Sequence, residues 1–339
     1  MKPMREMEPL REMKLFDRCP GTLREGHSSY SRTCLNKVFD GKKVHPFLSY
    51  SSPSFNGITN EMFDDSRKRT SISGVQEKFS LLQEKNKLRL INEGEQGTHI
   101  LKPIPLAGKN AEYMPANEHL TMQIAAQVFH IPTAENALIF FNDGQPAYIT
   151  KRFDVNPDGS KLAQEDFASL AKRTPHTHGE HYKYKGNYFQ LFELLQQFVP
   201  AYPIESVKLF KVLVFNYLLS NGDAHFKNFS LIETKQGDFK LSPAYDLLSS
   251  RLHINDSDFA LEEGLLPKAL AQGTVYEQFM RLAEIALIPK TQVRKIFDTL
   301  LTNRKSVERL ITRSFLSESL QRNYIQAYQT RIKKLTKTL

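Results

Sequence analysis

The chain has 339 residues, of which 40% are hydrophobic and 24% are charged, as in globular proteins that bury a sizeable core. Its apolar runs are far shorter than the roughly 20 residues that span a bilayer, and it opens without the apolar segment of a secretion signal. The two cysteines, Cys19 and Cys34, exclude a disulfide framework, so we expect a cytoplasmic protein with no membrane partner. The formal net charge of +9 favours anionic partners such as nucleotides, nucleic acid or acidic proteins.

Residues 1–70 predict a loop-rich N-terminal extension. Charged residues without periodicity open it, and a Ser- and Pro-containing stretch with a basic cluster closes it, as in a linker. Cys19 and Cys34 share this region with His27 and His45, but zinc modules usually pair their cysteines two to four residues apart. We therefore favour a structural interpretation of these residues over a metal site.

Residues 71–155 predict a β-rich N-lobe with one helix. Short apolar or alternating runs separated by polar turns are typical of strands, whereas Leu120, Ile124 and Val128 recur at the spacing of a helix face. Pro132 follows and stops that helix. The expected helix is residues 116–129, and the expected strands are residues 78–82, 88–91, 98–102, 137–141 and 147–152.

Residues 156–339 predict a helical C-lobe. Apolar stripes at helical spacing dominate it, and one short strand pair, residues 229–233 and 239–241, interrupts them. Residues 154–159 are rich in Asp, Asn, Pro and Gly and mark the hinge between the lobes. A sheet-rich front half and a helical back half predict an α+β, two-lobed fold.

The strongest chemical motif lies in residues 221–228, between a predicted buried helix and a strand. Protein kinases place an Asp that accepts the proton of the substrate hydroxyl five positions before an Asn that binds magnesium. Asp223 and Asn228 have this spacing, and Asp246 follows the short strand pair, where a second acidic ligand is expected. Together they predict phosphoryl transfer that uses ATP and Mg²⁺.

The front lobe supplies matching nucleotide-binding residues. Lys102 closes a predicted strand, where an ammonium group neutralises the α- and β-phosphates in protein kinases. Residues 71–78 begin with small side chains, which let backbone N–H groups approach phosphate oxygens. With one glycine, this loop matches neither the Walker A motif nor the Gly-rich dinucleotide motif.

Taken in order, these segments resemble the HipA-type serine/threonine kinases, the toxins of toxin–antitoxin modules. The resemblance covers about residues 70 to 250 and implies a two-lobed, protein-kinase-like fold. It rests on the loop of residues 71–78, the strand ending in Lys102, and the segments 151–154, 164–167, 221–228 and 243–247.

The chain is most similar to HipT, the short kinase of three-gene HipBST systems, because few residues precede Ser71 and the loop has the Ser-Ile-Ser form. This resemblance implies HipS-like and HipB-like antitoxin partners, contact with DNA only through the HipB-like partner, and a protein substrate such as an aminoacyl-tRNA synthetase. It also implies autophosphorylation of Ser71 and Ser73, and the added charge of about −1.5 to −2 predicts weaker ATP binding.

The resemblance assigns roles to individual residues. Asp223 is the expected catalytic base, and Asn228 and Asp246 are the expected magnesium ligands. Glu118 is expected to be an exposed helix residue, with pairing to Lys102 as the less favoured alternative, and Lys151 stands where HipA has an acidic residue. The expected ATP contacts are Ser73, Gly74, Val75, Gln76, Glu77, Lys78, Lys102, Lys151, Arg152, Phe153, His225 and Tyr245.

Two other functions remain compatible with the residues. A small-molecule phosphotransferase would share the Asp-to-Asn loop, and a non-catalytic, DNA-associated regulator would act inside an antitoxin complex. Residues 173–187 form a polar loop with His176, His178 and His181; we expect it to face the substrate, because long loops often carry recognition.

Overall fold

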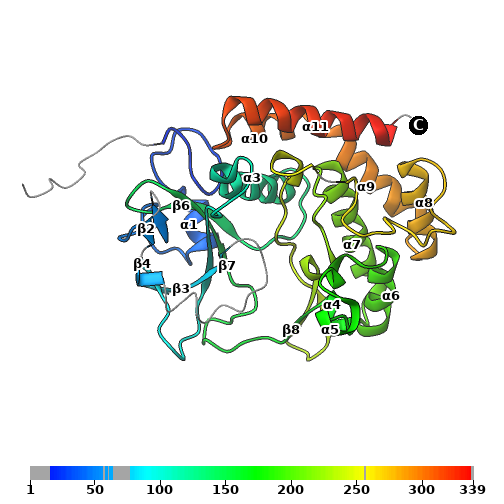
Figure 1. Cartoon of the computed structure of the whole chain (residues 1–339), viewed down its shortest axis with the longest axis horizontal. Helices are drawn as coiled ribbons and strands as arrows, with labels where there is room; N and C mark the ends of the chain where they lie inside the picture. The colour runs from blue at the N-terminus through cyan, green and yellow to red at the C-terminus, as the bar shows by residue number, and fades with distance from the viewer. Residues whose placement is uncertain (1–15, 56–57, 60, 64–76, 256, 337–339) are drawn as a thin grey trace, which may run out of the picture.

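The computed structural model describes residues 16–55, 58–59, 61–63, 77–255 and 257–336. A lobe built on a β-sheet lies beside a lobe built mainly of helices (Figure 1). The predicted α+β, two-lobed fold is therefore confirmed.

The N-lobe contains a five-stranded antiparallel sheet with the strand order β4-β3-β5-β7-β6. The pair of β7 and the edge strand β6 buries alternate residues on opposite faces: Leu138 and Tyr148 face the main core, whereas Ile139 and Ile149 belong to a second core. The alternation follows from the two-residue period of a strand. The strands are β3 (Phe79–Glu84), β4 (Lys87–Leu90), β5 (His99–Pro103), β6 (Asn136–Phe140) and β7 (Pro146–Lys151), each within two residues of its predicted bounds.

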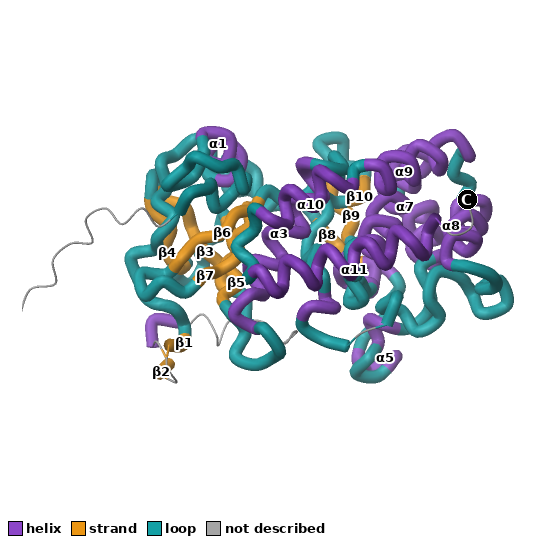
Figure 2. The backbone as a smooth tube through the Cα atoms, turned by 90° about the horizontal axis from the view of Figure 1, so that it is seen from above, coloured by secondary structure: helices purple, strands orange, loops and turns teal. Residues whose placement is uncertain are grey.

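Helix α3 (Met114–Gln127) follows the short 3-10 helix η2 (Ala111–Tyr113) and crosses between the sheet and the C-terminal helices (Figure 2). Its apolar stripe packs on the sheet. Its polar side is buried as well, because Asn117 exchanges hydrogen bonds of 2.9 and 3.1 Å with the backbone of Ser249, and Thr121 bonds the hydroxyl of Tyr324 at 2.7 Å. Both sides of α3 are therefore interfaces.

The described part of the first 70 residues packs on the other face of the sheet. It contains α1 (Arg32–Val38), β1 (Ser54–Phe55), β2 (Ile58–Thr59) and η1 (Glu61–Phe63). Tyr30 donates a 2.7 Å hydrogen bond to the carbonyl of Leu138, and the ring of His99 bonds the carbonyl of Val38 at 2.8 Å. This segment, predicted to be an extension, therefore shares the second core of the N-lobe.

The C-lobe surrounds the buried helix α7; α10 lies against α3, and α11 runs from there over the C-lobe, where it packs on α7 and α8 (Figure 1). A three-stranded sheet, β10-β9-β8, lies at its border with the N-lobe. None of the helices in the described ranges is both long and apolar enough to span a bilayer. The elements are β8 (Gln164–Asp166), α4 (Phe167–Leu170), α5 (Pro175–His178), η3 (Tyr182–Tyr184), α6 (Phe189–Phe198), α7 (Tyr202–Leu218), η4 (Phe226–Asn228), β9 (Ser230–Glu233), β10 (Phe239–Leu241), η5 (Ser250–Leu252), α8 (Val275–Ile285), α9 (Lys290–Thr302), α10 (Arg304–Thr312) and α11 (Glu318–Thr336).

Candidate active site

The loop after α7 is held by buried polar groups. Asn221 donates from its side chain to the amide oxygen of Asn216 at 3.0 Å. The hydroxyl of Ser250 accepts from the backbone of Gly222 at 2.7 Å and donates to the carbonyl of Ser220 at 3.0 Å. Because buried polar groups favour a unique arrangement when each is paired, this network fixes the backbone just before Asp223.

Asp223 and Asn228 occupy one compact turn. The backbone N–H of His225 donates to the carbonyl of Asp223 at 2.8 Å and to the side-chain oxygen of Asn228 at 3.0 Å. The carboxylate of Asp223 accepts a 2.7 Å hydrogen bond from the hydroxyl of Tyr184. The five-residue spacing thus places a carboxylate and an amide at opposite ends of the turn that ends in η4.

Asp246 is the point at which the two lobes meet. It has a left-handed backbone, with φ of 55°, a conformation that only a minority of non-glycine residues adopt. Its carboxylate pairs with Lys102 of β5, lies 3.6 Å from the ammonium of Lys78, and accepts from the amide of Asn228 at 3.4 Å. The side chains of both lobes therefore converge on this carboxylate.

Lys102 and Glu118 form a buried ion pair behind Asp246. Their charged atoms are 2.6 Å apart, and the two residues are only 4% and 3% exposed. Burial opposes the charge of Lys102, but the carboxylates of Asp246 and Glu118 outweigh it and raise its pKa above the ordinary value. Burial likewise opposes ionisation of Asp246, yet Lys102 and Lys78 hold its pKa well below the usual range. The pair Lys102–Asp246 is therefore ionised.

A cavity of about 640 Å³ opens beside these groups. It lies between the end of the N-lobe sheet and β8, and Tyr245, next to Asp246 in the chain, forms one of its walls. The ring of Phe153 lies 6.0 Å from the ring of Tyr245. The cavity is lined by Arg152, Asp154, Lys161, Leu162, Ala163, Gln164, Asp166, Lys227, Ser230, Glu233 and Tyr245.

This geometry agrees with the comparisons with known proteins. The family model for the HipA-like C-terminal domain matches residues 70–307. The chain belongs to this family.

Relatives of this family member are named as kinases. A Haemophilus influenzae protein named "Putative kinase" is 27% identical over 329 residues, which cover 91% of this chain and 93% of the relative. The Sinorhizobium fredii protein "Putative kinase Y4dM" is 32% identical over 254 residues, which cover 71% of this chain but 58% of the relative.

A solved structure shares the fold. A chain of the complex of HipA, HipB and operator DNA from the Shewanella oneidensis MR-1 toxin–antitoxin system matches with a TM-score of 0.61 and 20% sequence identity. The match covers 78% of this chain and 65% of that one. The two-lobed fold of this family member is therefore that of HipA.

One sequence-based expectation is wrong. Glu118 is buried and paired with Lys102, because it lies against β5 of its own lobe rather than in solvent. The side chain of Lys151 pairs with Asp40 of the N-terminal segment and does not line the cavity beside Arg152, and the contact of residues 151–153 with adenine stays a prediction. The expected phosphate-loop residues Ser71, Ser73, Gly74, Val75 and Gln76 lie outside the described residues.

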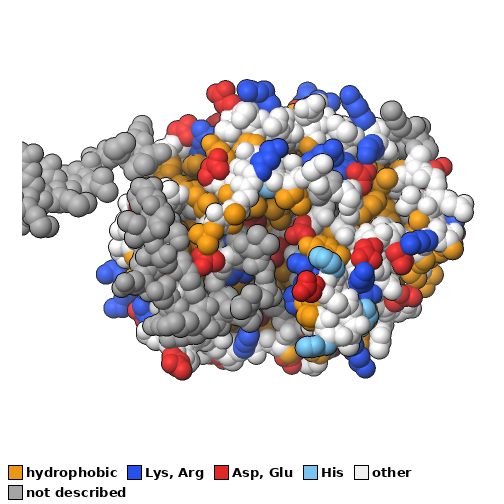
Figure 3. Space-filling model, in the orientation of Figure 1, with side chains coloured by type: hydrophobic (Ala, Val, Ile, Leu, Met, Phe, Trp, Pro, Cys, Tyr) orange, Lys and Arg blue, Asp and Glu red, His pale blue; other side chains and the backbone are white. Residues whose placement is uncertain are grey.

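Sequence reasoning missed the role of Tyr184. It lies in the polar loop of residues 173–187, in which His176, His178 and His181 are exposed. Exposed histidine side chains are visible on the face of the molecule seen in Figure 3. The described residues hold no cluster of three or more His, Cys, Asp or Glu suited to a metal ion. No motif in the sequence singles out Tyr184, because its contact with Asp223 spans 39 residues.

The donor groups around Asp246 fit ATP with magnesium. Carboxylate and amide oxygens are the ligands that Mg²⁺ prefers, and Asp246 and Asn228 present one of each. The side-chain oxygen of Asn228 accepts from the backbone of His225, but a carbonyl oxygen has a second lone pair for a cation. Lys102 lies beside them as a fixed positive charge for phosphates.

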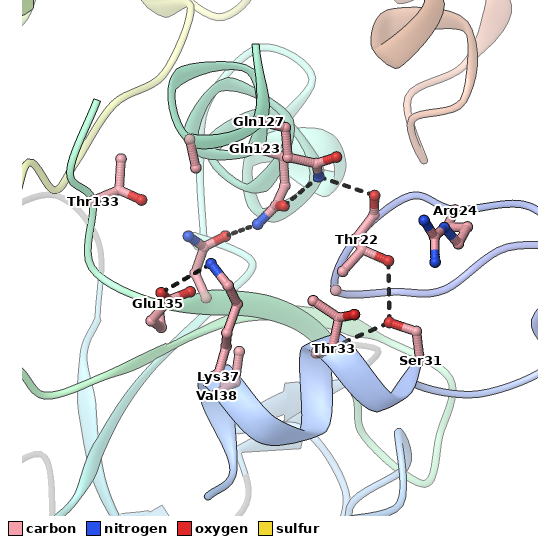
Figure 4. A pocket seen from close by; sticks show the side chains of 14 residues that line it. Thr22, Arg24, Ser31, Thr33, Lys37, Val38, Gln123, Gln127, Thr133 and Glu135 are labelled. Atoms are coloured by element: carbon pink, nitrogen blue, oxygen red, sulfur yellow. Dashed lines mark hydrogen bonds and ion pairs between the residues drawn. The ribbon is translucent and has the colours of Figure 1, made fainter. Parts of the chain in front are cut away.

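A second cavity, of about 260 Å³, lies on the far side of α3, between that helix, α1 and the segment before β6 (Figure 4). Gln127 donates to Gln123 at 2.7 Å, and Gln123 donates to Asn136 at 3.0 Å. Lys37 and Glu135 pair at its edge at 3.2 Å. None of the predicted catalytic or nucleotide-binding residues lines it, whereas Arg152 and Tyr245 line the cavity of about 640 Å³.

Proposed function

We propose that the protein is an ATP-dependent kinase that transfers the γ-phosphoryl group to a serine or threonine hydroxyl of a protein. The observation that carries this proposal is the convergence of Lys102, Asn228 and Asp246 on one point, beside a cavity and next to the turn of Asp223. Phosphoryl transfer depends on positioning and charge neutralisation of this kind.

Each group has a proposed task. Lys102, held by Glu118, pairs with the α- and β-phosphates, while Asn228 and Asp246 hold magnesium. Bound magnesium neutralises the charge that develops on the transferring phosphoryl group. Asp223 orients the acceptor hydroxyl and takes its proton as the new P–O bond forms and ADP leaves.

The biological role that we propose is that of a HipT-like toxin. The similarity to a HipA chain from a complex with HipB and operator DNA supports antitoxin partners of the HipB and HipS kinds, with DNA contacted through the HipB-like protein. An aminoacyl-tRNA synthetase is the proposed substrate, and Ser71 and Ser73 are the proposed autophosphorylation sites.

The experiment incubates the purified protein with γ-labelled ATP, magnesium and a cell lysate. We expect labelled protein bands whose acid hydrolysis yields phosphoserine or phosphothreonine. Asp223→Asn reduces the label to a small residual rate, and Asp238→Asn, in the exposed turn between β9 and β10, retains it in full. A labelled metabolite in place of labelled protein would identify a small-molecule phosphotransferase, and a complete absence of label would favour a regulator.

A further inference from the structure

The hydroxyl of Tyr184 holds the proposed catalytic base. It donates to Oδ1 of Asp223 at 2.7 Å, and the Tyr184 ring packs edge-on against the ring of His225, with centroids 5.1 Å apart and planes at 74°. Within the described residues, no other side chain donates to the carboxylate of Asp223. Its second oxygen therefore remains for an acceptor hydroxyl.

The segment that carries Tyr184 is anchored on both sides. The guanidinium of Arg173 lies 4.0 Å from the ring centroid of Phe226, in the catalytic turn, and donates to the carbonyl of Lys185. The hydroxyl of Tyr188 donates to the carbonyl of Ala224 at 2.7 Å. These contacts tie the Tyr184 segment to the turn that presents Asp223.

The loop that contains Glu262 and Glu263 holds the same segment through a second set of contacts. The backbone N–H of Glu262 donates to the carbonyl of Tyr184 at 3.0 Å, and that of Glu263 donates to the carbonyl of Gly186 at 3.0 Å. The ammonium of Lys185 pairs with Glu262 at 2.7 Å. Because two sets of contacts hold this segment, the phenol of Tyr184 is better suited to act as a static hydrogen-bond donor than as a mobile cover for the site.

From these contacts we infer that Tyr184 is a positioning residue for the phosphoryl transfer. This inference rests on the proposed function. The phenol restrains the rotation of the Asp223 carboxylate and keeps Oδ2 directed at the acceptor hydroxyl. Because a small misplacement of a catalytic group is costly, the loss of this bond reduces turnover rather than binding.

The test measures kcat and KM of Tyr184→Phe with ATP and the labelled protein substrate. We expect kcat to fall about tenfold to hundredfold, while KM for ATP and for the protein stay within about twofold. Tyr184→His keeps a donor and recovers part of kcat. The control, Tyr276→Phe on α8, where the ring packs on Phe297, leaves both constants unchanged.

A double-mutant cycle separates positioning from a structural role. In the Asp223→Asn background, Tyr184→Phe causes no further loss of the residual rate, because residues that act as a unit are not additive. Equal losses in both backgrounds would overturn the inference, as would an unchanged kcat or a rise in kcat/KM in the single variant.

The same measurements distinguish this inference from the proposed function. If the wild-type protein transfers no label and matches Asp223→Asn, both fail. If the wild-type protein is active and requires Asp223 while Tyr184→Phe keeps its full kcat, only the positioning role fails. Thermal unfolding of each variant confirms that a lost rate does not reflect a lost fold.

Discussion

The two lobes present their ionic groups to the site in opposite ways. In the N-lobe, Lys102 and Glu118 are both buried and are held by the sheet and by α3. In the C-lobe, Asp223 is partly exposed on a turn, and neutral amides and hydroxyls below the turn hold its backbone. The position of the Lys102 charge in the N-lobe therefore depends on other charges. The position of the Asp223 charge in the C-lobe depends on neutral amides and hydroxyls.

This difference predicts how substitutions in each lobe affect stability and activity. Removing one member of a buried ion pair leaves the other charge without compensation, which costs more than the pair itself contributes. Removing one neutral bond from a network costs the desolvation of a single group. The buried pair of the N-lobe is therefore where a single substitution is expected to have the largest combined effect on stability and activity.

The largest effect is expected for Lys102→Met. Glu118 and Asp246 would then face each other without the ammonium, and we expect the free energy of unfolding to fall by about 3–5 kcal/mol, with loss of phosphoryl transfer. Adding Glu118→Gln should recover part of the stability but not the transfer. Urea unfolding measures the first effect, and label incorporation measures the second.

The surface pair Lys37–Glu135 provides the control for this comparison. Its charged atoms are 3.2 Å apart and both side chains are about half exposed, so Lys37→Met should change stability by less than about 1 kcal/mol. If Lys102→Met proved as mild as Lys37→Met, the contrast between the lobes would lose its basis.

The next effect concerns Arg331 of α11, whose side chain is almost fully buried, at 1% exposed. Its guanidinium pairs with Asp258, lies 3.3 Å from the hydroxyl of Ser220 and stacks 4.6 Å from the Tyr217 ring centroid. We expect Arg331→Met to cost about 3 kcal/mol and to lower kcat, because Ser220 leads into the catalytic turn.

Arg322→Met on the same helix is the matched control, since Arg322 pairs with Glu318 at 3.8 Å with both side chains largely exposed. Thermal and urea unfolding of the two variants compare the buried and the exposed arginine directly. Equal stability of the two variants would show that the C-lobe does not depend on its buried charge.

The third effect is a dependence on pH that originates in the N-lobe. Burial lowers the pKa of His119 to about 4, against the partial opposition of its bond to the carbonyl of Gly21. The unfolded chain takes up this proton near pH 6.5, so the stability contribution of neutral His119 is complete above that pH. It is lost as the pH falls from about 6.5 towards 4.

We expect His119→Gln to remove about 2 kcal/mol of the stability lost between pH 6.5 and 4.5. His176→Gln, at an exposed position of α5, should leave the dependence unchanged. Urea unfolding at a series of pH values measures both. A wild-type protein equally stable at both pH values would contradict the prediction.

The smallest effect tests whether the N-terminal segment belongs to the N-lobe core. A Cβ at Gly21 would lie 2.0 Å from the Sγ of Cys34, so Gly21→Ala forces α1 away from the sheet. We expect a loss of about 1–2 kcal/mol in thermal unfolding, and a smaller loss in a Cys34→Ala background. The same loss in both backgrounds would mean that Cys34 is not the obstacle.

Much of the N-lobe sheet was predictable because its signals are local. Alternation and turn residues located β3 to β7 within two residues, and the hairpin of β9 and β10 followed from its Gly-containing turn. The spacing of Asp223 and Asn228 is likewise local, since both lie in one turn.

The polar side of α3 shows where such reasoning failed. A helix with one apolar stripe and polar residues elsewhere is typically exposed on its polar side, and Glu118 was interpreted in this way. In the structure that side carries Asn117 and Thr121 against Ser249 and Tyr324 of the other lobe, and Glu118 against Lys102 of the N-lobe sheet. The periodicity of a helix shows which of its side chains are polar, but it does not show which partner buries those side chains.

The sequence by itself determined the class of fold, the positions of the N-lobe strands along the chain and the spacing of Asp223 and Asn228 in one turn, because each depends on residues close together in the chain. Only the tertiary structure decided which groups meet: Lys102 with Asp246 across 144 residues, and Tyr184 with Asp223 across 39. Contacts of this length depend on how the lobes pack, and packing is a property of the whole chain rather than of any one motif.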